Sequence, residues 1–291
     1  SFCFKNMLIW QLFDTIFLTE NVRQKNDHVY SALLNRVRIG YPSDEDILLL
    51  KTRLVYNTQV NFSEHLHIFP TRKQVELYNK EQLTKLCNKT YVIHAEHYFS
   101  SSERNAHALV PMEMIPVDNS LAGGLEKELM ISINCRVMLT RNINTDQGLV
   151  NGAMGVVTNI DFMGSIPSII HVKFDNPTIG QVICNGRNTV HTPVHIQRIE
   201  TEFIYKGHHI VRSQFPLILS WACTVHKVQG ISLDSAVVDL GSTVFDYGMA
   251  YVALSRVRTL SGLILIRLDP MKIKASDSVI NEYERLKNLL L

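Results

Sequence analysis

The stretch L-I-L-S-W-A-C-T-V-H-K-V-Q-G, residues 217–230, decides the fold. Its first part, from Leu217 to Ala222, has the apolar character of a buried strand, and its second part is polar and ends at Gly230. In an open parallel sheet, ligands bind beyond the carboxyl ends of the strands. The stretch therefore predicts a parallel sheet with a ligand-binding loop directly after this strand.

The flanking segments alternate between helix and strand patterns. Val29, Leu33 and Val37 fall at helical spacing, and Gly40 follows as a helix-ending residue. Further helices are expected at 44–53, at 249–257, at 279–290 and after Thr71, and strands at 15–18, 66–69, 236–240 and 262–268. Such alternation is typical of an α/β domain in which helices cover a parallel sheet.

Residues 126–215 follow a different pattern, in which short strand-like runs are separated by turn residues such as Asn151-Gly152. Residues 96–125 show no clear period and are expected to form an extended connection. The sequence thus predicts an α/β domain built from residues 1–125 and 216–291, interrupted by a small β-barrel at 126–215.

Length and composition set outer limits on function. The 291 residues suffice for two modest domains, and 46% hydrophobic with 19% charged residues is typical of a globular protein. The net charge of +2, from 29 basic and 27 acidic residues, is lower than that of most dedicated nucleic-acid binders. Any contact with DNA must therefore come from the local placement of basic residues.

Neither a membrane partner nor a disulfide framework is expected. The longest apolar run, Phe215 to Val225, is shorter than the ~20 residues that a membrane helix needs. The five cysteines include no C-x-x-C pair, which is typical of reduced thiols in an intracellular protein and disfavours a zinc site. The chain begins with Ser in mid-pattern, so we expect a fragment of a longer protein.

Three stretches contain residues suited to binding phosphate. Lys227 and His226 follow the strand of residues 217–222, Arg256 ends the expected helix at 249–257, and Arg23 follows the expected strand at 15–18. Taken singly, each is explained without a ligand: as a polar loop after a core strand, as a cation at a helix C-terminus and as a surface residue.

In combination, these stretches resemble the C-terminal motifs of the PIF family of superfamily-one DNA helicases, which includes Helitron-type transposon helicases. T-V-H-K-V-Q-G-I-S-L-D, residues 224–234, is similar to the family's T-x-H-K-S-Q-G-x-T-L-D. A-Y-V-A-L-S-R-V-R, residues 250–258, matches its arginine-finger motif. Further similar regions are L-T-E-N-V-R-Q at 18–24, R-V-M-L-T-R-N-I at 136–143 and G-L-V-N-G-A-M-G at 148–155.

The resemblance implies the second, RecA-like motor domain of an ATP-dependent 5′–3′ DNA helicase. Arg23 and Arg256 would be the catalytic residues that reach the γ-phosphate, and Gln229 and Gly230 would face the nucleotide. Contacts to the backbone of single-stranded DNA would come from Thr224, His226, Lys227 and Gln229. ATP and Mg²⁺ would be held mainly by an N-terminal RecA-like domain of the same protein.

The chain departs from the family pattern in two ways. Val228 stands where the family usually has Ser, and the loss of that hydroxyl predicts weaker binding of the DNA strand. The sequence has no Gly-Lys dipeptide, so it lacks a G-x-x-x-x-G-K-[ST] phosphate loop, and it lacks an apolar strand ending in paired acidic residues. The first motor domain is therefore expected to be missing, and this chain alone should not hydrolyse ATP.

Two other functions stay open at this stage. The chain could be a motor-less helicase relic that acts as a non-catalytic nucleic-acid-binding module. It could also belong to an RNA helicase, since contacts to the backbone distinguish DNA from RNA poorly. The nucleus is the expected compartment, with the mitochondrion as the alternative, and the resemblance points to DNA repair, recombination or telomere maintenance.

Histidine pairs and tyrosines offer weaker signals. A metal site at His94 and His97, or at His191 and His195, is disfavoured because a third ligand is not apparent. Tyr247 and Tyr251 could stack on bases, but core packing is the favoured role.

Overall fold

The structure, a computed structural model, describes residues 6–18, 20–55, 64–86, 89–180, 183–184, 187–188 and 193–289. Its internal contacts divide the chain into two units. The first comprises Ser1–Val75 and Cys223–Leu291, and the second comprises Glu76–Ala222. The first unit contains a parallel sheet, which confirms the predicted α/β fold. The insertion, predicted as a small β-barrel, consists of separate antiparallel sheets.

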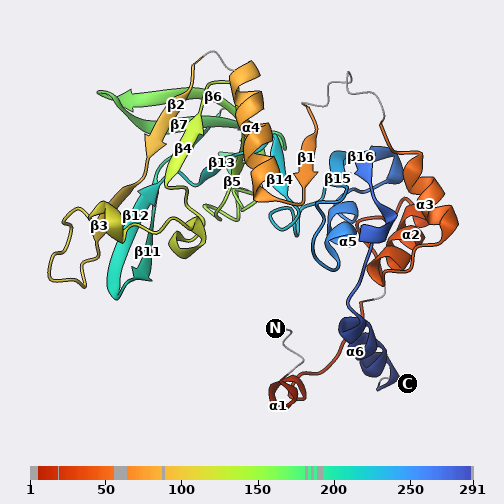
Figure 1. The fold of residues 1–291 in the computed structure, drawn as a ribbon. Coiled ribbons are helices and arrows are strands. Elements are labelled where there is room, and N and C mark those ends of the chain that lie inside the picture. The colour runs from red at the N-terminus through yellow and green to blue at the C-terminus, as the bar shows by residue number, and fades with distance from the viewer. Residues whose placement is uncertain are drawn as a thin grey trace. The chain divides into compact units, whose positions relative to one another are not determined.

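The sheet of the first unit has the order β14 (Ala222–Thr224), β1 (Leu66–Phe69), β15 (Ala236–Leu240) and β16 (Leu263–Leu268), as Figure 1 shows. β15 runs parallel to both β1 and β16, and all five of its residues are buried. Val225 N donates a hydrogen bond to Phe69 O at 3.2 Å, so the end of β14 lies beside the end of β1. The carboxyl ends of these strands therefore share one edge.

Most helices of this unit begin and end where the sequence predicts. The side chain of Ser43 accepts from Asp46 N, and the Asp46 carboxylate accepts from Ser43 N, so a capping box begins the helix predicted at 44–53. Gly40 has a φ of 77°, as a helix-ending glycine requires. The helices are α1 (Met7–Trp10), α2 (His28–Arg38), α3 (Asp44–Lys51), α5 (Met249–Leu254), α6 (Asp277–Asn288) and the short η4 (Leu260–Gly262) and η5 (Pro270–Lys272).

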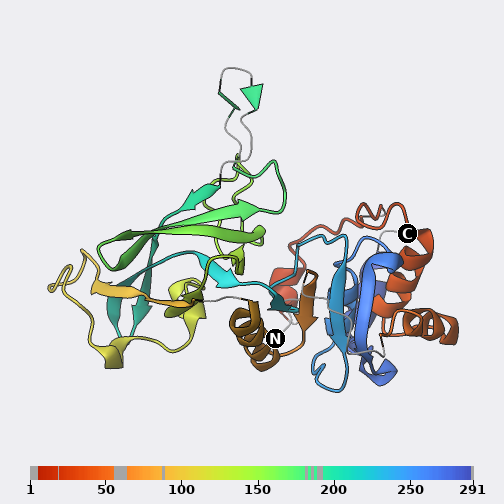
Figure 2. The ribbon, with the colours of Figure 1, turned by 90° about the horizontal axis from the view of Figure 1, so that it is seen from above.

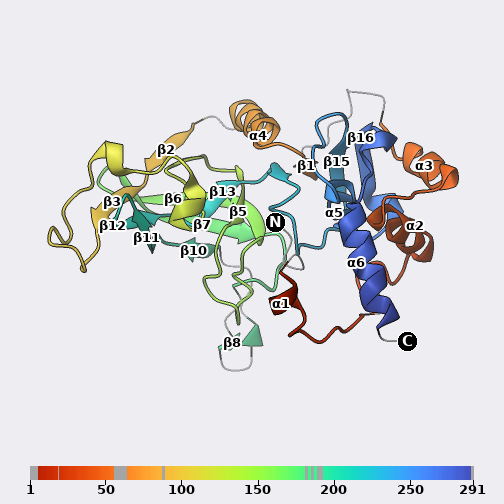
Figure 3. The same ribbon diagram turned by 60° about the horizontal axis from the view of Figure 1, so that its bottom comes forward.

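Several helices of the first unit contact one another or the sheet. α2 and α3 lie on the β16 side of the sheet (Figures 1 and 3). Tyr30 of α2 is fully buried, and its hydroxyl donates to Leu254 O of α5 at 2.8 Å. Trp10 of α1 donates from Nε1 to Glu282 of α6 at 2.7 Å.

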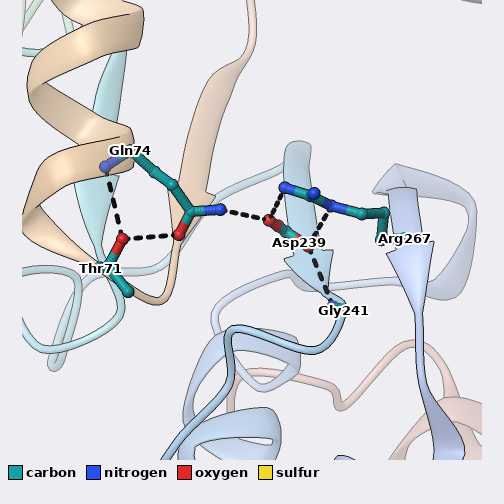
Figure 4. Close-up of polar contacts among 5 residues, drawn as sticks. All are labelled: Thr71, Gln74, Asp239, Gly241 and Arg267. Carbon is teal, nitrogen blue, oxygen red and sulfur yellow. Dashed lines mark hydrogen bonds and ion pairs between the residues drawn. The ribbon is translucent and has the colours of Figure 1, made fainter.

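A buried carboxylate fixes the carboxyl end of β15 (Figure 4). Asp239 is 0% exposed and accepts hydrogen bonds from Gln74 Nε2 at 2.9 Å, from Arg267 Nε at 2.9 Å and from Gly241 N at 3.0 Å. Gln74 lies in the first turn of α4 (Arg72–Leu86), whose start is capped by Thr71 as predicted. The network therefore joins β15, β16 and the start of α4.

The second unit consists of antiparallel sheets, and its long strands β6 and β7 are the green arrows in Figure 2. The largest sheet has the order β10 (Val194–Ile196), β7 (Ile166–Phe174), β6 (Met154–Met163), β5 (Arg136–Leu139) and β13 (Leu217–Leu219). A second has the order β11 (Ile199–Tyr205), β12 (His208–Gln214) and β3 (Glu96–Phe99). The remaining elements are the pairs β2 (Tyr91–His94) with β4 (Glu128–Ile131) and β8 (Ile183–Cys184) with β9 (Arg187–Asn188), and the short helices η2 (Met112–Met114) and η3 (Asn119–Ala122).

Arg212 of β12 is the centre of a buried hydrogen-bond network in the second unit. Its side chain is fully buried, and its Nε donates to His97 Nε2 at 2.8 Å. Its Nη1 donates to Asn119 Oδ1 and to Leu125 O, both at 2.8 Å, and its Nη2 donates to Pro116 O at 3.3 Å. One guanidinium thus holds β3 and the connection at residues 116–125 in place.

The division of the chain differs from the predicted boundaries at 125/126 and 215/216. Strands β2 and β3 pair with β4 and β12, so residues 76–125 cluster with the insertion. The predicted strand at 217–222 splits in two, because β13 pairs antiparallel with β5 while β14 joins the parallel sheet. The predicted strand at Thr15–Leu18 was wrong, since these residues have no strand pairing among the described residues.

Candidate nucleotide and nucleic-acid site

Three stretches that are far apart in the sequence meet at Arg23. Its Nε donates a hydrogen bond to Ser232 Oγ at 2.8 Å, and its Nη1 donates one to Ser255 O at 3.0 Å. Arg23 precedes α2, Ser232 precedes β15 and Ser255 ends α5. All three belong to the first unit, so the structure brings the three predicted motifs together.

Arg256 lies next to this junction and is buried. Its Nε donates to Val252 O at 2.8 Å and its Nη2 donates to Ser255 Oγ at 2.7 Å. Burial lowers the pKa of the Arg256 guanidinium, and the charge of Arg23 lowers it further. In the part of the chain that the structure describes, neither arginine forms an ion pair with a carboxylate. Two neighbouring cations without an acidic partner fit an anion such as a phosphate.

Gln24 and Tyr30 brace the backbone around the two arginines. Gln24 is 3% exposed, and its Nε2 donates to Ser255 O at 3.2 Å and to Val257 O at 2.7 Å. Burial raises the pKa of the Tyr30 phenol, whose hydroxyl donates to Leu254 O. The end of α5 is therefore held by two side chains from the segment that contains Arg23.

The loop at 225–230 is a series of tight turns with an exposed polar surface. Thr224 O accepts from Lys227 N at 3.0 Å and from Val228 N at 3.3 Å, and Gly230 has a φ of 91°. The side chains of His226, Lys227 and Gln229 are exposed. Among the described residues none of these side chains has a hydrogen-bond partner, so they are free to bind a ligand.

Val228 points the other way, because it is 0% exposed. Neighbouring Cys223 is also buried, and burial raises the pKa of its thiol to about 12, which leaves that thiol protonated and unreactive at neutral pH. The prediction that the Ser-to-Val difference removes a DNA contact therefore receives no support from the geometry, since a side chain at position 228 faces the core.

One short segment connects the two groups of predicted residues. It leaves β14 at Thr224, next to the carboxyl end of β1, and reaches Arg23 at Ser232. Leu233 N donates to Arg256 O at 2.9 Å, which fixes the far end of the segment to the arginine motif. Thr224, His226 and Lys227 thus lie near one edge of the sheet, and Gln229 and Gly230 lie on the way to the arginines.

Sequence reasoning missed three residues of this site, namely Gln24, Ser232 and Ser255. All three lie inside the motifs quoted above, so membership of those motifs could have identified them. Their roles depend on contacts to backbone carbonyls and to Arg23, which no spacing rule predicts.

Other candidate sites stay without support. Within the described ranges, no group of three or more His, Cys, Asp or Glu residues is placed to hold a metal ion. His94 lies 3.6 Å from Glu128, and His97 accepts from Arg212, whereas His191 lies outside the described residues. No helix among the described residues has the length and apolarity to cross a membrane.

Comparison with known proteins finds similarity to one family of helicases. The family model for the 2B domain of DNA helicase Pif1 matches residues 120–160. The ATP-dependent DNA helicase PIF1 of Rattus norvegicus is 31% identical over 273 residues, which are 94% of this chain and 38% of the rat protein. The Pif1 helicase of Bdellovibrio bacteriovorus is 29% identical over 295 residues, covering 99% of this chain and 58% of that protein.

Solved structures show the same fold. The Pif1 helicase from Candida albicans superposes with a TM-score of 0.71 at 24% identity, covering 94% of this chain and 61% of that one. The Bacteroides Pif1 helicase in complex with ADP-AlF3 and single-stranded DNA gives a TM-score of 0.62 at 22% identity, covering 98% and 63%. The chain spans about two fifths of the length of its vertebrate relatives. These matches confirm the resemblance to the PIF helicases.

Proposed function

We propose that this chain, a PIF-family sequence by those matches, works as the C-terminal motor domain of an ATP-dependent 5′–3′ DNA helicase. In this role it binds single-stranded DNA through the loop at 225–230 and supplies Arg23 and Arg256 to the ATP site. The observation that carries the proposal is the convergence of both arginines on Ser255, with no carboxylate partner among the described residues.

The chemistry of the arginine pair fits the γ-phosphate of ATP. Phosphoryl transfer is catalysed by positioned cations that stabilise charge on the transferring group, and a planar guanidinium matches that geometry. Arg256 is held by its own helix and Arg23 by two serines, so both are positioned before nucleotide arrives. Bound ATP would supply the phosphate chain. The N-terminal RecA-like domain would contribute the phosphate loop and hold the Mg²⁺ ion.

DNA binding is assigned to the exposed loop. His226, Lys227 and Gln229 offer side chains that can contact phosphates without reading the bases. The Bacteroides relative binds single-stranded DNA together with a nucleotide analogue, which supports the same pair of ligands here. The segment from Thr224 to Ser232 would then connect the DNA to the arginine pair.

Binding of single-stranded DNA at low and high salt tests the DNA assignment. We expect affinity to fall steeply with salt, and Lys227→Ala to weaken binding and lower the salt slope by roughly one. Lys287→Ala, which changes an exposed lysine of α6, is the matched control and should bind like the parent chain. Binding that responds to neither salt nor Lys227→Ala would contradict the assignment.

ATP hydrolysis separates the motor domain from the relic. The chain alone is expected to be inactive, and activity above background that Arg256→Ala abolishes would contradict this. When this chain is joined to an N-terminal domain that has a phosphate loop, the fusion should hydrolyse ATP if the chain is a motor domain. It should be inactive if the chain is only a nucleic-acid-binding module. Competition between single-stranded DNA and RNA of one sequence addresses the choice of nucleic acid.

A further inference from the structure

Two aromatic side chains are exposed in the loop that follows β15. Phe245 is 67% exposed and Tyr247 is 62% exposed, and they are separated in the chain by Asp246 alone. The predicted core packing is therefore wrong for Tyr247, whereas Tyr251 on α5 is partly buried. Two exposed aromatic rings so close in the sequence offer apolar faces on which a planar ligand can stack.

The loop that presents this pair is anchored on both sides. At its start, Gly241 N donates to the buried Asp239, and a Cβ at Gly241 would lie 3.1 Å from Arg267 Cδ (Figure 4). Val244 is 2% exposed, and Gly248 N donates to Lys274 O at 2.8 Å. Because the backbone is already fixed, covering the two rings loses little conformational entropy.

The loop lies at the same sheet edge as the predicted DNA contacts. β14 and β15 flank β1, and neighbouring strands are ~4.8 Å apart, so the loops that follow them begin roughly 10 Å from each other. His226 and Lys227 can therefore contact the phosphate side of a single DNA strand while its bases reach Phe245. Asp246 is exposed and repels phosphate, which favours the base side of a nucleic acid at this loop.

We propose that Phe245 and Tyr247 form a stacking platform for the bases of the single strand whose phosphates contact His226 and Lys227. The inference rests on the proposed DNA-binding function of this edge and adds to it a second kind of contact. Aromatic rings accept any base on their faces, so the platform increases affinity without setting sequence. A basic loop beside an aromatic loop is the combination that single-strand binding uses.

Oligothymidylate and an abasic oligonucleotide of the same length test the platform, because the two share their phosphates and differ only in bases. The parent chain should bind the thymidylate more tightly. The double variant Phe245→Ala with Tyr247→Ala should lose about five-fold or more for each lost stacking contact on thymidylate and stay unchanged on the abasic strand. The double variant Phe245→Trp with Tyr247→Trp, which keeps two aromatic rings, should retain the parent chain's preference for the thymidylate over the abasic strand.

Two controls separate the possible failures. Phe13→Ala removes an aromatic side chain of similar exposure, 65%, from the N-terminal segment and should leave both affinities unchanged. Lys227→Ala should weaken both oligonucleotides equally. A double variant that binds thymidylate like the parent chain would overturn the platform while the phosphate contacts stand. Salt-insensitive binding of both strands by the parent chain would overturn the proposed DNA function and the platform with it.

Discussion

Among the residues whose burial the structure describes, two arginines are buried, Arg212 in the second unit and Arg256 in the first, and they use their donors differently. Arg212 is fully buried, and each of its three nitrogens donates to a partner on β3 or on the connection at 116–125. Nε and Nη2 of Arg256 donate hydrogen bonds to Val252 and Ser255 at the end of its own helix. Its Nη1 has no hydrogen bond to any described residue.

This difference distinguishes a structural arginine from one available to a ligand. Burial of a guanidinium is costly unless its donors are satisfied, and Arg212 meets that condition with uncharged partners. Burial lowers the pKa of both guanidinium groups, but the charge of Glu126 raises that of Arg212, whereas the charge of Arg23 lowers that of Arg256 further. An anion would satisfy the remaining donor and relieve the repulsion between the two cations.

The largest expected effect is on ATP hydrolysis after substitution of Arg256. In a protein that includes the phosphate-loop domain, Arg256→Ala should lower kcat by about 10³-fold or more, because an arginine at the γ-phosphate contributes at least that much. Single-stranded DNA affinity should not change. Steady-state ATP hydrolysis and DNA titration of the same preparation measure kcat and DNA affinity. An unchanged kcat would show that Arg256 does not act at the ATP site.

Arg212→Ala should act on stability instead. The substitution leaves His97, Asn119 and two carbonyl groups without their donor, so we expect a loss of about 3 kcal/mol or more in the free energy of unfolding. Urea denaturation measures it, with Arg104→Ala, which changes an exposed arginine of the same unit, as the control. A loss no larger than that of the control would mean that Arg212 does not hold the connection.

His97 makes the Arg212 cluster sensitive to acid. Burial, followed by the charges of Arg212 and Lys127, lowers the pKa of His97 to about 4, against an ordinary value of about 6.5. The unfolded chain therefore binds the extra proton first, and stability is lost as pH falls from about 6.5 to about 4. Allowing for solvent screening, the loss should be roughly 1–2 kcal/mol. His97→Gln should flatten the pH dependence of unfolding in that window, and an unchanged profile would assign it to other groups.

A substitution at Val228 is expected to change stability and not DNA binding. A serine there would place a hydroxyl in the core and remove two methyl groups, so Val228→Ser should cost about 1–2 kcal/mol of stability. DNA affinity should stay the same, because the side chain faces away from solvent. Tighter DNA binding by Val228→Ser would restore the idea that the family's serine contacts the strand.

Local signals allowed most elements of the first unit to be predicted. The capping box at Ser43, the glycine at position 40 and the β-branched run of β15 each act within a few residues, so their outcome follows from the sequence. Thr15–Leu18 was wrongly predicted as a strand, and Leu217–Leu219, a strand as predicted, joins an antiparallel sheet instead of the parallel one. A strand depends on its pairing partner, which sequence patterns do not reveal. The prediction that Tyr247 packs in the core was wrong for a related reason, because the exposure of a side chain depends on the surrounding fold.

The site was predictable as a set of residue types and not as an arrangement. Arg23 and Arg256 were identified from motifs, but their common contact with Ser255 depends on the pairing of segments more than two hundred residues apart. The bracing by Gln24 has the same origin. Motifs therefore name the groups, and tertiary contacts set their geometry.

Under the proposed function, the short segment from Thr224 to Ser232 implies reciprocity between DNA and nucleotide. If DNA at Lys227 shifts this segment and so changes the affinity of the arginine pair for nucleotide by some factor, nucleotide must change the affinity for DNA by the same factor. The coupling free energy is then one quantity that can be measured from either end. A cycle of tight and weak DNA binding would follow from the state of the nucleotide alone.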